Sequence, residues 1–133
     1  MGKRYLIDSN ILIDFTARKL PDQVYKSIES IIDQEFIISF VTKIEVLGYS
    51  HADEGWKMFI DQAQLLVLDD LVINETIQIR KKHKIKLPDA IIAATASINH
   101  LILITRNTGD FSNIKGLSAE NPWLWNPTQT PHS

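Results

Sequence analysis

Cysteine is absent from the 133 residues, which excludes a disulfide framework and thiolate metal sites. Long hydrophobic runs are also missing, and no apolar segment approaches the length needed to cross a bilayer. The apolar stretch after the basic start ends at Asp8, too early for a signal peptide, and Leu6 breaks the N-myristoylation pattern. We therefore expect a cytoplasmic protein that does not use a membrane.

A strong excess of one charge is missing as well. The net charge of −2 creates no global field that favours nucleic acid, so such binding would need a local patch, a metal or a partner surface. The composition, 44% hydrophobic and 23% charged, is that of an ordinary globular protein, and the length fits one domain. We expect a single domain over residues 1–126, followed by a loosely ordered tail at 127–133.

Short apolar runs alternate with amphipathic helical patterns along the chain. The expected strands lie at 5–7, 36–40, 65–68 and 101–104, with a short edge strand within 116–120. Helices are expected from Asp8, over 23–34 with Asp22 as the N-cap, from Thr42, from Asp53, over 72–83 and from Pro88. This alternation predicts an α/β fold, with a mainly parallel sheet covered by helices on both faces. Ligands of such sheets bind beyond the carboxyl ends of the strands.

The helix predicted from Pro88 has an unusual stripe. Pro88 suits its first position, and Asp89 falls in the first turn on the same stripe as Ala93 and Ala96. Because this stripe has little side-chain bulk, a neighbouring element can come close to the Asp89 carboxylate. Taken alone, Asp89 is explained by the helix dipole, which stabilises such an acid by about 0.3–1 kcal/mol. A functional role requires other acids to converge on it.

Three further acids lie where they could converge. Asp8 ends the first strand, and Asp110 follows the last core strand. Glu45 shares a helical stripe with apolar neighbours, and a carboxylate buried there is costly without a cation or hydrogen-bond donors. Solvated surface is the ordinary explanation for each acid alone. Asp33, Glu35, Asp61 and Glu75 fit that explanation, whereas Glu45 fits it poorly.

Converging carboxylates repel one another unless a cation joins them. Carboxylate oxygens suit Mg²⁺ or Mn²⁺, and a bound Mg²⁺ can activate water for phosphodiester hydrolysis. Zinc would more commonly use histidine or cysteine. The four histidines show no paired ligand spacing: His51, His83, His100 and His132. The residues therefore favour Mg²⁺, with Mn²⁺ as a plausible substitute.

The segments that carry these acids resemble the motifs of PIN-domain ribonucleases. The closest branch looks like the VapC toxins of bacterial and archaeal type II toxin–antitoxin pairs. Each motif alone is weak, but their order and spacing match along nearly the whole chain, up to Asn121-Pro122-Trp123. The matching segments are 6–10, 42–45, 87–96 and 105–111. The resemblance implies a three-layer PIN-like fold.

The resemblance also implies a site and an activity. Its catalytic, metal-holding acids carry over to Asp8, Glu45, Asp89 and Asp110. The supporting polar residues are Ser9, Asn10, Thr105 and Asn107, and Asn107 stands where some relatives have another acid. The implied activity is Mg²⁺-dependent cleavage of RNA phosphodiester bonds by metal-activated water. A homodimer and neutralisation by a cognate antitoxin are implied as well.

A basic run at 80–86 lies just before Asp89. It has two explanations, a solvated helix C-terminus and an electrostatic track that leads RNA phosphates to the acids. On the second explanation, the candidate RNA-binding residues are Lys82, Lys84, Lys86 and Arg106. Tryptophan could stack on bases, but packing within the protein is the stronger expectation for Trp56, Trp123 and Trp125.

Two other functions remain open from the sequence. An aspartyl-phosphate phosphatase on a similar sheet needs a second acid two residues after the first, but Asn10 occupies that position. A non-catalytic interaction module would keep the fold and only bind a partner, although the presence of all four acids argues against a decayed site. Chelation-sensitive RNA cleavage, hydrolysis of a phosphomonoester, or neither would distinguish the three.

Overall fold

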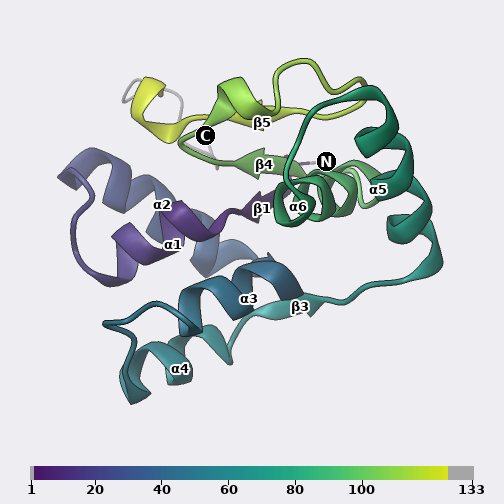
Figure 1. The fold of residues 1–133 in the computed structure, drawn as a ribbon. Coiled ribbons are helices and arrows are strands. Elements are labelled where there is room, and N and C mark those ends of the chain that lie inside the picture. The colour runs from purple at the N-terminus through teal and green to yellow at the C-terminus, as the bar shows by residue number, and fades with distance from the viewer. Residues whose placement is uncertain (1, 126–133) are drawn as a thin grey trace.

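Parallel strands form the centre of the computed structural model, which describes residues 2–125. The strands are β1 (Tyr5–Ile7), β2 (Ile37–Ser39), β3 (Gln64–Leu66), β4 (Ile102–Ile104) and β5 (Ala119–Glu120). β4 pairs in parallel with β1 on one side and with β5 on the other (Figure 1). β2 pairs in parallel with β3 and lies beside β1. The spatial order is therefore β3-β2-β1-β4-β5.

Helices connect these strands. They are α1 (Ser9–Thr16), α2 (Asp22–Gln34), α3 (Phe40–Leu47), α4 (Glu54–Ile60), α5 (Asp70–Lys82) and α6 (Leu87–Ile98). Two short 3₁₀ helices follow, η1 (Thr108–Asp110) and η2 (Pro122–Leu124). No helix in residues 2–125 has the length and apolar character needed to cross a membrane.

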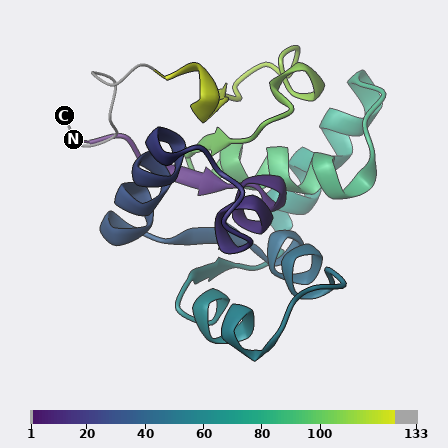
Figure 2. The ribbon, with the colours of Figure 1, turned by 90° about the vertical axis from the view of Figure 1, so that its left-hand side faces the viewer.

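Alternation along the strands separates two hydrophobic cores. Leu6, Ile37 and Leu103 pack with α5 and α6, whereas Ile7 and Ile104 pack with α1, α2 and α4. Figure 2 shows α2 on the opposite side of β1 from α5 and α6. The predicted three-layer α/β architecture, a parallel sheet with helices on both faces, is confirmed.

The predicted starts of α1 and α4 are confirmed, and those of the other four helices lie one or two residues from the observed ones. Asp8 and Asp53 cap α1 and α4 as expected. The third helix starts at Phe40 rather than at Thr42, because the buried Ser39 hydroxyl accepts the Val41 N–H at 3.1 Å.

The second misplaced start is that of α2. Asp22 already lies within this helix, and Pro21 occupies its N-cap position. The negative charge of Asp22 therefore interacts favourably with the positive end of the helix dipole. Its side chain does not cap the helix.

The third strand is shorter and more exposed than predicted. It covers Gln64–Leu66, and the exposed Val67 and Leu68 lie in the connection to α5. An apolar run alone does not separate an edge strand from an exposed loop, because both can be apolar. The predicted domain end at 126 and the loose tail at 127–133 lie outside the described residues.

The α6 stripe is built as its sequence predicts. Pro88 lies in the first turn, and Ala93 and Ala96 are completely buried. Asp89 stands at the amino-terminal end of this stripe and is half-buried. Because the alanines occupy so little space, α6 can pack closely on the sheet and bring Asp89 to the end of β1.

Candidate active site

Asp8 is the most buried acid of the site. It follows β1, only 5% of it is exposed, and it lies on the same side of the strand as Leu6, facing the α6 layer. Its Oδ1 accepts the Ser9 N–H at 2.8 Å, and its Oδ2 accepts the Thr105 hydroxyl at 2.8 Å. Asp8 is thus the N-cap of α1 and is also tied to the end of β4.

Glu45 reaches this position from α3. Its Oε1 accepts a hydrogen bond from the Ser9 hydroxyl at 2.7 Å, and the same hydroxyl lies 3.4 Å from Asp8 Oδ1. Ser9 therefore connects the two carboxylates. The prediction that Glu45 lies on a buried face is wrong: Val41, Thr42 and Val46 are the buried residues of α3, and Glu45 is exposed.

Asp89 and Asp110 meet at the edge of a cavity. This cavity of about 370 Å³ lies between the 83–86 connection and the segment that includes η1. Both carboxylates line it, together with Gly109 and Asn113. Lys84 and Lys86 line the same cavity, on the segment that leads into α6 and Asp89. Cations beside the acids suit a substrate that carries negative charge.

Electrostatics place the four acids in one neighbourhood. Burial raises the pKa of Asp8, and so do the charges of Asp89 and Glu45, while hydrogen bonds from Thr105 and Ser9 oppose the rise. Burial also raises the pKa of Asp89, with further contributions from Glu45 and Asp110, against the opposing charge of Lys86. The ionised forms of Asp8 and Asp89 are therefore each repelled by two other carboxylates. A cation placed among these acids would relieve the repulsion.

The donor atoms fit a hard divalent cation. Asp8, Glu45, Asp89 and Asp110 offer only carboxylate oxygens, the ligands that Mg²⁺ and Mn²⁺ prefer. Within residues 2–125, however, no group of three or more His, Cys, Asp or Glu side chains is arranged to hold a metal ion. Binding a cation therefore requires side chains to move, and the exposure of Glu45 and Asp110 leaves them free to do so.

Of the supporting residues predicted from the sequence, Ser9, Asn10 and Thr105 contact Asp8, and Asn107 reaches it only through Thr105. Asn10 Nδ2 lies 3.4 Å from Asp8 Oδ2 and 3.3 Å from Thr105 Oγ1. Asn107 contributes its backbone N–H, which donates to Thr105 Oγ1 at 3.2 Å. The Thr105 hydroxyl accepts these bonds and directs its own proton to Asp8.

The four predicted RNA-binding residues do not lie together. Lys84 and Lys86 line the acidic cavity, whereas Lys82 is exposed at the end of α5 and is not part of the lining. Arg106 is directed elsewhere, with its guanidinium 4.3 Å from the Trp123 ring centre and 3.6 Å from Asp14. The sequence signal was charge alone, which does not show the direction in which a side chain points.

Sequence reasoning missed several residues around the site. His83 and Asn113 line the cavity, and Asp14 is the ion-pair partner of Arg106. Asp14 lies six residues after the Asp8 N-cap, a spacing that turns it about 120° around α1, so no helical pattern groups the two acids. The packing expectation for tryptophan is confirmed, because Trp56, Trp123 and Trp125 all pack against the core around α1 and α2.

Comparison with known protein families agrees with this geometry. A family model described as PIN domain matches residues 5–117. The chain belongs to the PIN domain family. A comparison with curated proteins gives no significant match.

Solved structures share the PIN fold over nearly their full length. A chain of a toxin-antitoxin complex from Klebsiella pneumoniae is 32% identical, with a TM-score of 0.71, 89% of this chain covered and 97% of that chain. FitAcB from Neisseria gonorrhoeae is 26% identical, with a TM-score of 0.70 and coverages of 91% and 99%. DNA-bound VapBC from Salmonella typhimurium, at 22% identity, a TM-score of 0.73 and coverages of 90% and 98%, shows the shared fold.

Asp89→Asn tests whether Asp89 belongs to a repelling cluster. The substitution removes a favourable helix-dipole charge, worth at most about 1 kcal/mol, and also removes carboxylate repulsion. We expect the metal-free variant at neutral pH to melt no lower than the parent protein, and we expect Mg²⁺ to raise the parent's melting temperature but not the variant's. Thermal melts in EDTA and in Mg²⁺ measure both.

The pH dependence of these melts follows from the raised pKa of Asp89. The folded protein binds this proton more tightly than the unfolded chain, so ionised Asp89 destabilises the parent above its raised pKa. That loss disappears as the pH falls towards the ordinary value of 3.8, and the variant's advantage should shrink with it. Asp70→Asn is the control, because exposed Asp70 occupies the first turn of α5. If the melting temperatures of the two variants changed equally with pH, Asp89 would affect stability only through the helix dipole.

Proposed function

We propose that this PIN domain is a metal-dependent endoribonuclease and the toxin of a toxin–antitoxin pair. The observation that carries the proposal is the mutual electrostatic influence of four carboxylates beyond β1 and β4, with two lysines lining the cavity beside Asp89 and Asp110. The toxin assignment is supported by the 32% identity to a chain of the Klebsiella pneumoniae toxin-antitoxin complex.

Asp8, Glu45, Asp89 and Asp110 are the residues that would hold Mg²⁺, with Mn²⁺ as a substitute. When bound, the ion would supply Lewis-acid polarisation of the scissile phosphate and lower the pKa of the attacking water. Thr105 and Ser9 keep Asp8 oriented through their hydrogen bonds. Lys84 and Lys86 are placed to attract the phosphates that flank the cleavage position.

Two other functions have less support. In the phosphatase alternative, a general acid would stand at position 10, but Asn10 cannot donate a proton to a leaving group, and its amide is engaged with Thr105 and Arg106. A non-catalytic module would have no use for an acid whose pKa is raised by burial and, further, by two neighbouring carboxylates.

The activity test is cleavage of a defined single-stranded RNA. We expect cleavage with Mg²⁺ or Mn²⁺, its loss in EDTA, and a loss of at least about a hundredfold in Asp8→Asn and Asp89→Asn, since each removes part of the charge that holds the ion. Asp33→Asn, on an exposed residue of α2, is the control. Chelation-sensitive hydrolysis of a phosphomonoester without RNA cleavage would instead identify a phosphatase. If the protein catalysed neither reaction, the non-catalytic interaction module would be the remaining function.

The role of the two cavity lysines in RNA binding is tested by removing their charge. Lys84→Gln with Lys86→Gln should weaken RNA binding and reduce the slope of log K against log[salt] by about 0.7 for each phosphate that the protein no longer neutralises. Lys81→Gln with Lys82→Gln makes the same charge change outside the cavity lining and is the control. RNA-binding titrations over a salt series measure both pairs. Equal effects of the two pairs would mean that only overall charge matters.

An antitoxin would inhibit by covering the acidic cavity. We propose that it places an arginine among the carboxylates, because the planar guanidinium can bridge two of them. The protein from the adjoining reading frame should then inhibit cleavage less as Mg²⁺ is raised, since the two cations compete. Inhibition that does not depend on Mg²⁺ would contradict this mechanism.

We also propose a homodimer acting in the cytoplasm, where its RNA substrate is found, and the mass of the purified protein in solution tests the dimer.

A further inference from the structure

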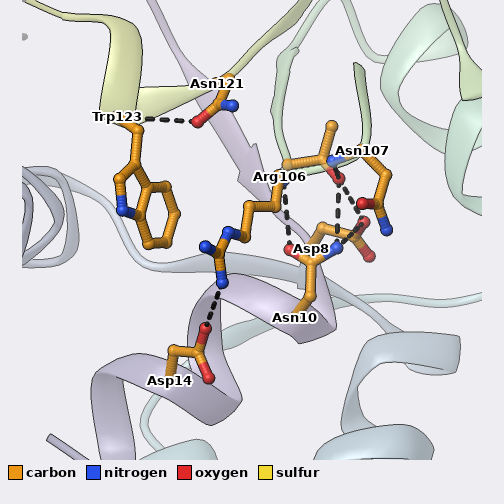
Figure 3. Close-up of polar contacts among 8 residues, drawn as sticks. Asp8, Asn10, Asp14, Arg106, Asn107, Asn121 and Trp123 are labelled. Atoms are coloured by element: carbon orange, nitrogen blue, oxygen red, sulfur yellow. Dashed lines mark hydrogen bonds and ion pairs between the residues drawn. The ribbon is translucent and has the colours of Figure 1, made fainter. Parts of the chain in front are cut away.

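Arg106 is held on three sides by the protein itself. Its guanidinium carbon lies 4.3 Å from the Trp123 ring centre, and its Nη1 lies 3.6 Å from Asp14 Oδ2. Its backbone N–H donates to Asn10 Oδ1 at 3.3 Å. Figure 3 shows the side chain extending past the face of Trp123 towards Asp14, away from Asp8. The two side-chain partners direct the guanidinium away from Asp8, while 54% of the side chain stays exposed.

The backbone contact of Arg106 reaches the buried acid through Asn10. The two ends of an asparagine amide differ, since its oxygen accepts and its nitrogen donates. The Arg106 N–H engages Oδ1, which leaves Nδ2 directed towards Asp8 Oδ2 and Thr105 Oγ1 (Figure 3). If the amide were reversed, its oxygen would face the Asp8 carboxylate and repel it. The position of the Arg106 backbone thus selects the amide orientation that supports Asp8.

The side chain of Arg106 fixes that backbone position. A guanidinium over an indole is attracted by the ring face, and the attraction is strongest for tryptophan. Trp123 is itself held, because its backbone N–H donates to Asn121 Oδ1 at 2.9 Å and its ring packs on the core around α1 and α2. The stack therefore anchors the segment after β4 to the segment that contains η2, over the α1 side of the site.

We propose that Arg106 is a positioning residue for Asp8 and that Trp123 is its anchor, so that the segment around η2 completes the support of the active site. This role replaces the RNA contact expected for Arg106 from its charge. The kinetic part of the test rests on the proposed ribonuclease function. The hydrogen-exchange part does not, so the two can fail separately.

Amide hydrogen exchange of the metal-free protein tests the geometry directly. The Arg106 N–H should be protected in the parent protein and should exchange about tenfold faster in Arg106→Gln and Trp123→Leu, as expected when a local contact opens. Asn10→Ala should remove the protection, because the acceptor is gone. Trp123→Phe keeps an aromatic face and should retain most of it. If Trp123→Leu does not fold, Arg106→Gln, at an exposed position, carries the test alone. Unchanged exchange in Arg106→Gln would overturn the anchoring.

RNA cleavage distinguishes positioning from substrate contact. Arg106→Gln and Trp123→Leu should lower kcat about tenfold or more, the usual effect of removing a partner that orients a metal ligand. KM and its salt dependence should stay unchanged, and Trp123→Phe should restore most of kcat. Lys115→Gln removes an exposed cation elsewhere and is the control. A raised KM with a flatter salt dependence and unchanged kcat would instead make Arg106 an RNA contact and overturn the proposal.

Discussion

Mutual repulsion among carboxylates is the constraint on which this site depends. Asp8 is almost completely buried, and both Asp89 and Glu45 add to the cost of its charge. The protein offsets part of that cost with hydrogen bonds from Thr105 and Ser9. It leaves the rest uncompensated, so the folded chain stores an unfavourable interaction that only a positive charge can remove. Affinity for a cation, and for a basic group that imitates one, has the same origin.

The fold supplies this arrangement by combining rigid and mobile contributors. Asp8 and Thr105 follow the central paired strands β1 and β4, and both are buried. Glu45 and Asp110 stand on exposed positions of α3 and η1, where their side chains can adjust. Asp89 is intermediate, at the end of an alanine stripe that brings α6 close to the sheet. One fixed carboxylate with movable neighbours can adapt to a cation without rearranging the core.

The sequence predicted the architecture well because the central strands β1 and β4 are largely apolar and α1 and α4 begin at aspartate caps. It also singled out the four acids, since each lies at the end of a predicted element or in a family motif, and their role as metal ligands stays a prediction. It misjudged Glu45, because a stripe on one helix does not show whether a neighbour covers that face. It misplaced the start of α3, because Ser39 belongs to a strand and still caps the helix. The role of Arg106 was inaccessible, since its partners Asp14 and Trp123 lie far from it in the sequence and nothing local links them.

The pairing of β1 with β4 has a consequence for how the protein is made. Tyr5 pairs with Ile102, so β1 cannot pair with β4 until residues 102–104 have been synthesised. Such non-local parallel contacts form late in folding. Asp8 gains its Thr105 hydrogen bond only then, and Asp110 and the Arg106–Trp123 stack come later still along the chain. A ribosome-bound chain that ends before β4 therefore carries Asp8, Glu45 and Asp89 without an assembled site.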